Sequence, residues 1–349
     1  MNYSIIVPVY NRPDEVDELL QSLVRQTMKD FEVIIVEDGS HIPCKDICAK
    51  YADVLDLHYY HKDNSGPGQS RNYGADRSHG EWLIILDSDV VLPDGYLQAI
   101  NEELAPHSPV PFAAFGGPDA SHPSFTPIQK AISYSMTSFF TTGGIRGGKK
   151  KLDKFYPRSF NMGIRSDVYR QLGGFSRMRF GEDIDFSYRI VEAGHATRLI
   201  PEAWVWHKRR TDLRKFWRQV FNSGIARINL EKRHPGTLKL VHLLPMVFTL
   251  GVFFCCIATI ISIIVTAISG QYFPSGIIGI VALSPLLLYS TIICTHSTLQ
   301  NKSLRVGLLS VPAAFVQLMG YGCGFLSAWW KRCVLGQDEF QAYEKNFYK

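Results

Sequence analysis

One stretch of the sequence decides the predicted fold, Trp82-Leu83-Ile84-Ile85-Leu86-Asp87-Ser88-Asp89. Its apolar run is too short for a buried helix and rich in β-favouring residues, so it predicts a buried strand. The two carboxylates that follow would repel by about 4 kcal/mol at about 4 Å and an effective dielectric constant of about 20. A divalent cation such as Mg²⁺ or Mn²⁺ prefers oxygen ligands and removes that repulsion, and a diphosphate is its natural partner. The alternative is a strand-to-turn junction in which Asp-Ser-Asp only turns the chain.

Strands and helices alternate through the first part of the chain. We predict strands over 4–9, 31–36, 55–60 and 82–86, and helices over 15–26 (with Asp14 as N-cap), 69–77, 94–104, 168–172 and 184–193. This alternation predicts an α/β domain with a mostly parallel sheet and helices on both faces. Ligands bind such sheets beyond the carboxyl ends of the strands. Three strand ends carry special residues, Pro8-Val9-Tyr10, Glu37-Asp38 and Asp87-Ser88-Asp89, so we expect one site at that edge.

The positive charge of the chain is concentrated in one segment. The net charge is +5 over 349 residues, yet nine Lys and Arg residues lie between His207 and Lys239, against only Asp212 and Glu231. No Asp, Glu, Lys or Arg follows until Lys302. A membrane span needs about 20 apolar residues, so this uncharged stretch predicts transmembrane helices. The N-terminus lacks the basic and apolar regions of a signal peptide, so we expect the preceding domain in the cytoplasm, in agreement with the positive-inside rule.

The membrane region is predicted to contain two or three spans. Residues 243–268 and 276–294 form the first two, and residues 306–330 form a third that Pro312 and several glycines weaken. Three full spans would place the basic end Lys331-Arg332 outside, so either the third segment is re-entrant or the charge rule is overruled. Residues 213–228 form a basic amphipathic helix that we expect in the headgroup plane, with an ordinary surface helix as the alternative.

Residues 112–154 are rich in proline and glycine and include Lys149-Lys150-Lys151. Such a composition is typical of a mobile flap or of a surface loop. The predicted domains are therefore 1–210 (the α/β domain), 211–239 (the interfacial helix and linker), 240–332 (the transmembrane region) and 333–349 (a polar tail).

Five ordered motifs resemble family 2 glycosyltransferases with the GT-A fold. They are Ile5-Ile6-Val7-Pro8-Val9-Tyr10-Asn11, Glu37-Asp38-Gly39-Ser40, Gly66-Pro67-Gly68-Gln69-Ser70-Arg71-Asn72-Tyr73-Gly74, the Asp-x-Asp pattern Asp87-Ser88-Asp89, and Gly181-Glu182-Asp183. The resemblance covers residues 3–210. It implies inverting transfer of a sugar from a nucleotide donor to an acceptor hydroxyl, with Mg²⁺ or Mn²⁺ as cofactor.

The resemblance also implies roles for residues of the donor site. Pro8, Val9 and Tyr10 would line the base pocket, and Asp38 would accept a hydrogen bond from the base. Arg71 would approach the ribose or the diphosphate, as suits its planar set of donors, with a helix-surface salt bridge as the alternative. Asp87 and Asp89 would hold ribose and metal, Asp89 being the stronger metal ligand.

Inversion requires one base on the acceptor side. Asp183 is the first candidate and Glu182 the second, because neighbouring carboxylates raise one another's pKa values. Complementarity to the helix dipole is the simpler explanation of this acidic cluster. His207 and Arg210 resemble a His-x-x-Arg element of some relatives, in which the histidine would be a third metal ligand and the arginine would bind diphosphate. A structural histidine is the alternative.

The predicted function is transfer of one sugar, with a UDP-sugar as the expected donor, to a lipid-linked or glycan acceptor in surface polysaccharide biosynthesis. The expected location is the bacterial inner membrane, with the catalytic domain in the cytoplasm and no nucleic-acid partner. A processive polysaccharide synthase is a rival, but its Gln-x-x-Arg-Trp signature is absent from Trp217-Arg218-Gln219-Val220-Phe221. A membrane protein that binds nucleotide sugars without turnover is the other.

Overall fold

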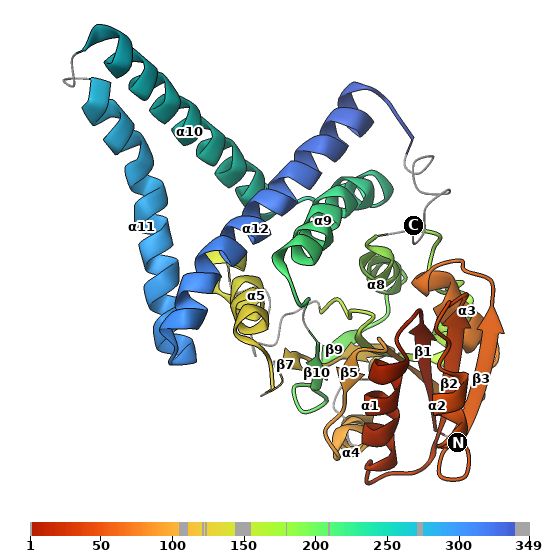
Figure 1. The fold of residues 1–349 in the computed structure, drawn as a ribbon. Helices are drawn as coiled ribbons and strands as arrows, with labels where there is room; N and C mark the ends of the chain where they lie inside the picture. Colours follow the sequence, from red (N-terminus) through yellow and green to blue (C-terminus); the bar gives the residue numbers. More distant parts are fainter. Residues whose placement is uncertain are drawn as a thin grey trace. The chain divides into compact units, whose positions relative to one another are not determined.

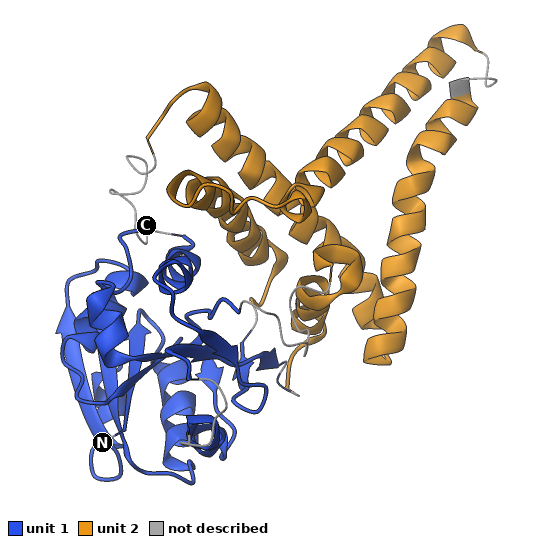
Figure 2. Cartoon of the chain, turned by 180° about the vertical axis from the view of Figure 1, so that it is seen from behind, with its two compact units in different colours: residues 1–122, 149–208, 340–349 blue, residues 123–148, 209–339 orange. Residues whose placement is uncertain are grey.

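A computed structural model describes residues 2–104, 111–120, 122, 124–143, 155–178, 180–208, 210–270 and 275–338. The chain divides into two compact units, drawn in blue and orange in Figure 2. Described residues up to 122 and from 155 to 208 form the first unit, and those from 124 to 143 and from 210 to 338 form the second. The lysine cluster of the predicted flap and most of the predicted polar tail lie outside the described residues.

The first unit is built on a mixed seven-stranded sheet, with strand order β3-β2-β1-β4-β8-β6-β9. Figure 1 shows β1, β2 and β3 side by side in this sheet. The strands β1 to β4 are parallel, as predicted, whereas β8 runs antiparallel to both β4 and β6. A smaller sheet has the order β5-β10-β7. The bounds are β1 Tyr3–Val9, β2 Phe31–Asp38, β3 Asp56–Lys62, β4 Trp82–Leu86, β5 Val90–Val91, β6 Ala114–Gly116, β7 Asp119–Ala120, β8 Asn161–Arg165, β9 Thr197–Leu199 and β10 Val205–His207.

Helices cover both faces of the large sheet because its central strands are apolar on both sides. Ile5 and Val7 of β1 belong to the core that contains α1 and α4, whereas Ile6 belongs to the core that contains α3, α7 and α8. Each such fully buried side chain contributes roughly 1.5–3 kcal/mol of transfer free energy. The helices are α1 Pro13–Val24, α2 Lys45–Ala49, α3 Pro67–Ala75, α4 Tyr96–Leu104, α7 Ser166–Gln171 and α8 Glu182–Glu192. The predicted N-cap of α1 was wrong, because Arg12 occupies that position and Pro13 begins the helix.

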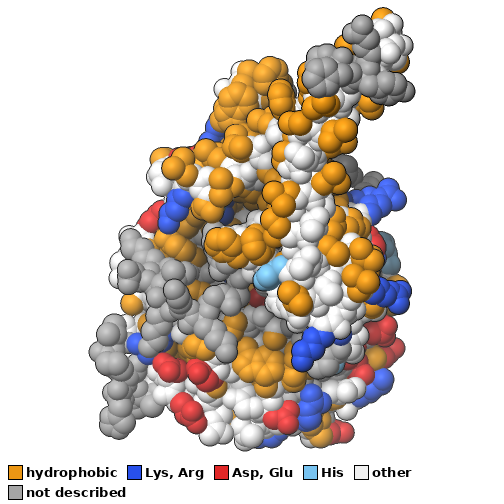
Figure 3. Space-filling model, turned by 90° about the vertical axis from the view of Figure 1, so that its left-hand side faces the viewer, with side chains coloured by type: hydrophobic (Ala, Val, Ile, Leu, Met, Phe, Trp, Pro, Cys, Tyr) orange, Lys and Arg blue, Asp and Glu red, His pale blue; other side chains and the backbone are white. Residues whose placement is uncertain are grey.

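The second unit is helical. It contains α5 Pro127–Thr137, α6 Phe139–Thr142, α9 Leu213–Arg233, the 3₁₀ turn Leu240–His242, α10 Leu244–Ser269, α11 Ser275–Asn301, α12 Leu304–Trp329 and the π turn Trp330–Val334. Three helices, within 240–269, 276–301 and 304–334, are long and apolar enough to cross a membrane. Hydrophobic side chains gather on their visible surface (Figure 3), and α12 continues through Pro312 without a break.

Protein residues cover part of the apolar side of α9. Phe216 and Val220 pack against residues of α5 and α12. Glycines allow the close approach, since a Cβ at Gly224 would lie 2.1 Å from the carbonyl oxygen of Tyr321. Residues 124–143, which the sequence analysis includes in the N-terminal domain, belong to this helical unit because α5 buries its own apolar face there.

Candidate functional site

The structure brings three predicted metal ligands together at the end of β4. One ligand atom each of Asp87, Asp89 and His207 lie within 4.8 Å of one another. The short pairing of β5 with β10 explains this, because His207 lies opposite Val90 and the backbone N–H of Lys208 donates to the carbonyl oxygen of Asp89 (3.0 Å). Two carboxylates and an imidazole are a donor set that suits Mn²⁺ and related divalent cations.

Asp89 contacts the side chains of an arginine and a histidine. Its carboxylate is 7% exposed, and it accepts a hydrogen bond from Nη1 of Arg12 at 2.7 Å. Nε2 of His207 lies 3.2 Å from the other oxygen, and the His207 ring stacks on Phe160 with a centroid distance of 5.0 Å. A buried carboxylate needs such a counter-charge. The residues therefore fit a bound dication, which would take the place that Arg12 fills beside Asp89.

Arg71 links the acidic end of β4 to the start of α8. It is 3% exposed and donates to Asp87 (2.8 Å) and to Glu182 (3.0 Å). The guanidinium lies 5.1 Å from the centre of the Phe175 ring. The side chain of Asn72 donates to the carbonyl oxygen of Phe175 and accepts from its N–H, both at 2.8 Å. Helix α3 thus fixes the loop that precedes α8.

Glu182 and Asp183 begin α8, after Gly181 with φ of +84°. Burial raises the pKa of Glu182 to about 7, although Arg71 opposes this shift. Burial also acts to raise the pKa of Asp183, but the interactions with Arg158, with Arg71 and with the N–H of Ile184 together outweigh burial and hold that pKa below its ordinary value. Nε of Arg158 donates to Asp183 at 2.6 Å. The pKa values of the two adjacent carboxyls therefore move in opposite directions, because burial dominates at Glu182 and the charge and hydrogen-bond interactions dominate at Asp183.

Asp38 ends β2 at the same edge, where it anchors the loop before α3. Its carboxylate is 2% exposed and accepts from the N–H groups of Ser65 (2.9 Å) and Gly66 (2.8 Å) and from the ammonium of Lys62. Pro8 and Val9 are buried at the end of β1, and Tyr10 after them is half-buried. The register of β1 and β2 places Val9 opposite Glu37.

The sequence analysis missed three cations of this site. Lys62 ends β3 at the carboxyl edge of the sheet. The rule that ligands bind beyond the carboxyl ends of the strands, which predicted Asp38, therefore applied to Lys62 as well. Arg12 directly follows the first motif, but nothing in the sequence indicates its contact with Asp89. Nothing in the sequence around Arg158 indicates its contact with Asp183. The remaining predicted residue, Arg210, belongs to the second unit.

The fold of the first unit and the acidic cluster at its sheet edge define a GT-A protein. The same fold occurs in the mannosyltransferase PcManGT from Pyrobaculum calidifontis, solved in complex with GDP-Man and Mn²⁺; the TM-score is 0.53 at 15% identity, over 95% of this chain and 88% of that one. Residues 4–173 match the model of the family "Glycosyl transferase family 2". Through these residues the chain belongs to glycosyl transferase family 2.

Two curated relatives carry specific names. The pre-mycofactocin glycosyltransferase of Mycobacterium tuberculosis is 30% identical over 254 residues, which are 66% of this chain and 48% of the relative. The validoxylamine A glucosyltransferase of Streptomyces hygroscopicus is 26% identical over 230 residues, which are 58% of this chain and 54% of the relative. The chain spans about half the length of these relatives.

Proposed function

We propose that the protein is an inverting glycosyltransferase that moves a sugar from a nucleoside-diphosphate donor to an acceptor hydroxyl. The clustering of Asp87, Asp89 and His207 is the observation that carries the proposal. Family membership and the Mn²⁺ and GDP-Man of the P. calidifontis structure support it. UDP-sugars are our first choice of donor.

The donor end of the site has two parts in this proposal. Asp87, Asp89 and His207 hold Mg²⁺ or Mn²⁺, which when bound supplies positive charge to the leaving diphosphate. Asp38, Pro8, Val9 and Tyr10 line the pocket of the base. Arg71 is nearly inaccessible and bonded to two carboxylates, so we assign it a positioning role, in which it fixes Asp87 relative to Glu182. Arg210 remains our candidate for a further diphosphate contact.

Asp183 is the proposed base. Its carboxylate takes the proton of the acceptor hydroxyl as the acceptor oxygen bonds to the anomeric carbon of the sugar. The bond from that carbon to the diphosphate breaks at the same time, and its electron pair leaves with the nucleoside diphosphate. Arg158 keeps Asp183 ionised and therefore able to accept the proton. Glu182, with a pKa of about 7, is the alternative base.

The acceptor is proposed to be a lipid-linked glycan of surface polysaccharide biosynthesis, used at the cytoplasmic face of the bacterial inner membrane. Three helices of membrane-spanning length support the membrane location. The basic residues that precede the first of them favour anionic headgroups on that side. The missing Gln-x-x-Arg-Trp signature favours transfer of one sugar over polymerisation.

The test uses membranes that contain the full chain and radiolabelled UDP-, GDP- and dTDP-sugars, with Mn²⁺ or with a chelator. We expect transfer of one label to a lipid-extractable product, lost in the chelator and in Asp89→Asn and Asp183→Asn. The exposed Asp53→Asn is the matched control. Unchanged transfer in both site variants would refute the assignment. Nucleotide-sugar binding with no transfer at all would favour the non-catalytic alternative, and long products would favour a processive synthase.

A further inference from the structure

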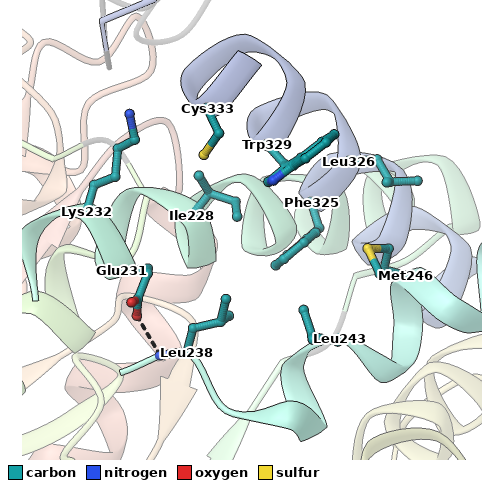
Figure 4. A pocket seen from close by; sticks show the side chains of 10 residues that line it. All are labelled: Ile228, Glu231, Lys232, Leu238, Leu243, Met246, Phe325, Leu326, Trp329 and Cys333. Atoms are coloured by element: carbon teal, nitrogen blue, oxygen red, sulfur yellow. Dashed lines mark hydrogen bonds between the residues drawn. The ribbon is translucent and has the colours of Figure 1, made fainter. Parts of the chain in front are cut away.

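The helical unit contains a pocket of about 560 Å³ that the proposed chemistry does not use. Figure 4 shows it between the end of α9, the segment before and at the start of α10, and the end of α12. All of these elements belong to the second unit. Its lining includes Glu231, Lys232, Leu238, Leu243, Phe325 and Cys333.

The lining indicates a hydrocarbon ligand. Eight of the ten lining residues are apolar or sulfur-containing, and Leu238, Leu243 and Phe325 point toward the same space in Figure 4. The volume lies within the range of about 300–1,000 Å³ for small-molecule sites. At about 30 Å³ per heavy atom, the share of one molecule in liquid water, it holds about 20 heavy atoms. That corresponds to one chain of about four isoprene units, and it is too small for both acyl chains of a phospholipid.

The charge around the pocket favours an anionic head on that chain. Within residues 228–246 and 325–338, basic residues outnumber acidic ones by five to two. The carboxylate of Glu231 accepts hydrogen bonds from the N–H groups of Gly236 (2.9 Å) and Leu238 (2.6 Å). Its negative charge is therefore partly compensated by backbone donors. Lys232 lines the pocket and donates to the backbone carbonyl oxygen of Arg332 (2.7 Å). The basic residues are Lys232, Arg233, Lys239, Lys331 and Arg332.

We propose that this pocket binds a single-chain lipid phosphate, with the isoprenoid chain between α9, α10 and α12 and the phosphate beside Lys232. The proposal rests on the lipid-linked acceptor of the proposed function and names its lipid class. The location at the ends of two helices of membrane-spanning length gives a lipid direct access. Phosphate oxygens suit Lys and Arg as charge-assisted partners.

The experiment is photolabelling of the full chain in phosphatidylcholine nanodiscs with a diazirine-bearing farnesyl monophosphate. We expect labelled peptides from residues 228–246 and 325–333. Labelling should fall about tenfold, or about 1.4 kcal/mol, in Leu243→Trp, which fills the pocket. Cys333→Trp fills the pocket from an exposed position, so it tests the same expectation if Leu243→Trp misfolds. Leu250→Trp, 49% exposed on α10 and outside the pocket, should leave labelling unchanged.

Competition separates the possible occupants. Unlabelled farnesyl monophosphate should compete at least about tenfold better than farnesol or phosphatidic acid. Equal competition by phosphatidic acid would overturn the proposal in favour of a two-chain phospholipid. Labelling that spreads along all three long helices and ignores both pocket-filling variants would overturn it in favour of bulk lipid.

The two proposals fail in different ways. Sugar transfer to a membrane acceptor is measured on the same preparation as photolabelling. If Mn²⁺-dependent transfer persists without specific labelling, the lipid pocket is refuted and the glycosyltransferase stands. If specific labelling persists while no donor is turned over under any condition, the enzymatic proposal is refuted and the pocket stands.

Discussion

Replacing Glu182 by glutamine tests the electrostatics of the site. Glu182 is 8% exposed at the start of α8, and burial is the largest cause of its raised pKa. Glutamine has nearly the same shape and stands for the protonated carboxyl. The comparison therefore isolates the cost of an ionised Glu182 in the folded protein.

The size of the expected stability difference follows from the pKa shift of Glu182. An acid with an ordinary pKa of 4.5 that is raised to about 7 on folding binds more protons when folded than when unfolded between these values. Its contribution to stability is fully present below about pH 4.5 and is lost as the pH rises to 7. A difference of about 2.5 units at 1.36 kcal/mol each gives about 3 kcal/mol. We expect Glu182→Gln to be more stable than the natural chain by about 3 kcal/mol at pH 8, and by about 1 kcal/mol at pH 5.

Thermal unfolding of the full chain in detergent, with a chelator present, is the assay. At about 2–4 °C per kcal/mol, the variant should unfold about 6–12 °C higher at pH 8. Glu192→Gln is the matched control, because Glu192 is exposed on the same helix and should show no comparable difference. An advantage of Glu182→Gln that is equal at pH 5 and pH 8, or absent at both, would refute the reasoning.

Three further substitutions test the contacts around the site and within the helical unit. Arg12→Gln should tighten Mn²⁺ binding without nucleotide by about tenfold in a calorimetric titration, because the guanidinium that bonds Asp89 is removed; a weaker affinity would contradict this. Arg158→Met should move the acid limb of the kcat/KM profile upward by about 1–3 pH units, because Arg158 lowers the pKa of Asp183; an unmoved limb would exclude Asp183 as the titrating base. Gly224→Ala should lower Tm, because its Cβ would meet the Tyr321 carbonyl oxygen, and we expect a loss of about 1–3 kcal/mol in the free energy of unfolding. Gly251→Ala is the control and should leave Tm unchanged, because its Cβ meets nothing within 4 Å.

The sequence predicts the first half of the sheet because β1, β2 and β4 contain continuous apolar runs, and strands and helices alternate there. The strand β8 carries no such signal. Its sequence is Asn161-Met162-Gly163-Ile164-Arg165, and Gly163 is covered by the ring of Phe115, which a Cβ would approach to 2.0 Å. The strands β5, β7 and β10 have only two or three residues, too few for any periodicity.

One helix was missed although its signal was present. Helix α5 begins with a capping box, in which the Thr126 hydroxyl accepts from the N–H of Gln129 and the Gln129 side chain accepts from the N–H of Thr126. The pattern Thr-x-x-Gln before an apolar run indicates a helix start. The prolines and glycines around it outweighed that pattern in the sequence analysis. For α9 the apolar face was predicted correctly, but an apolar face alone does not show whether lipid or protein covers it.

The acidic residues of the site were predictable, and their cationic partners were not. Asp87 and Asp89 stand out because carboxylates directly follow a buried strand. Arg12 and Arg158 are single cations far along the chain from the carboxylates they contact, and no local pattern marks such a pair. His207 came only from the family resemblance, since 118 residues separate it from Asp89.

The four cations matter because together they hold the acidic residues of this edge in place before any ligand arrives. Asp38 has Lys62, Asp87 and Glu182 share Arg71, Asp89 has Arg12, and Asp183 has Arg158. A buried charge without a partner is costly, so removing one of these cations would destabilise the folded site in the absence of donor. Arg12 differs from Arg71 in being one-third exposed rather than buried. It can therefore leave Asp89 for solvent or for a phosphate when a dication replaces it, whereas Arg71 is buried and bonded to both Asp87 and Glu182. This difference in exposure is why we assign exchange with ligand to Arg12 and a fixed position to Arg71.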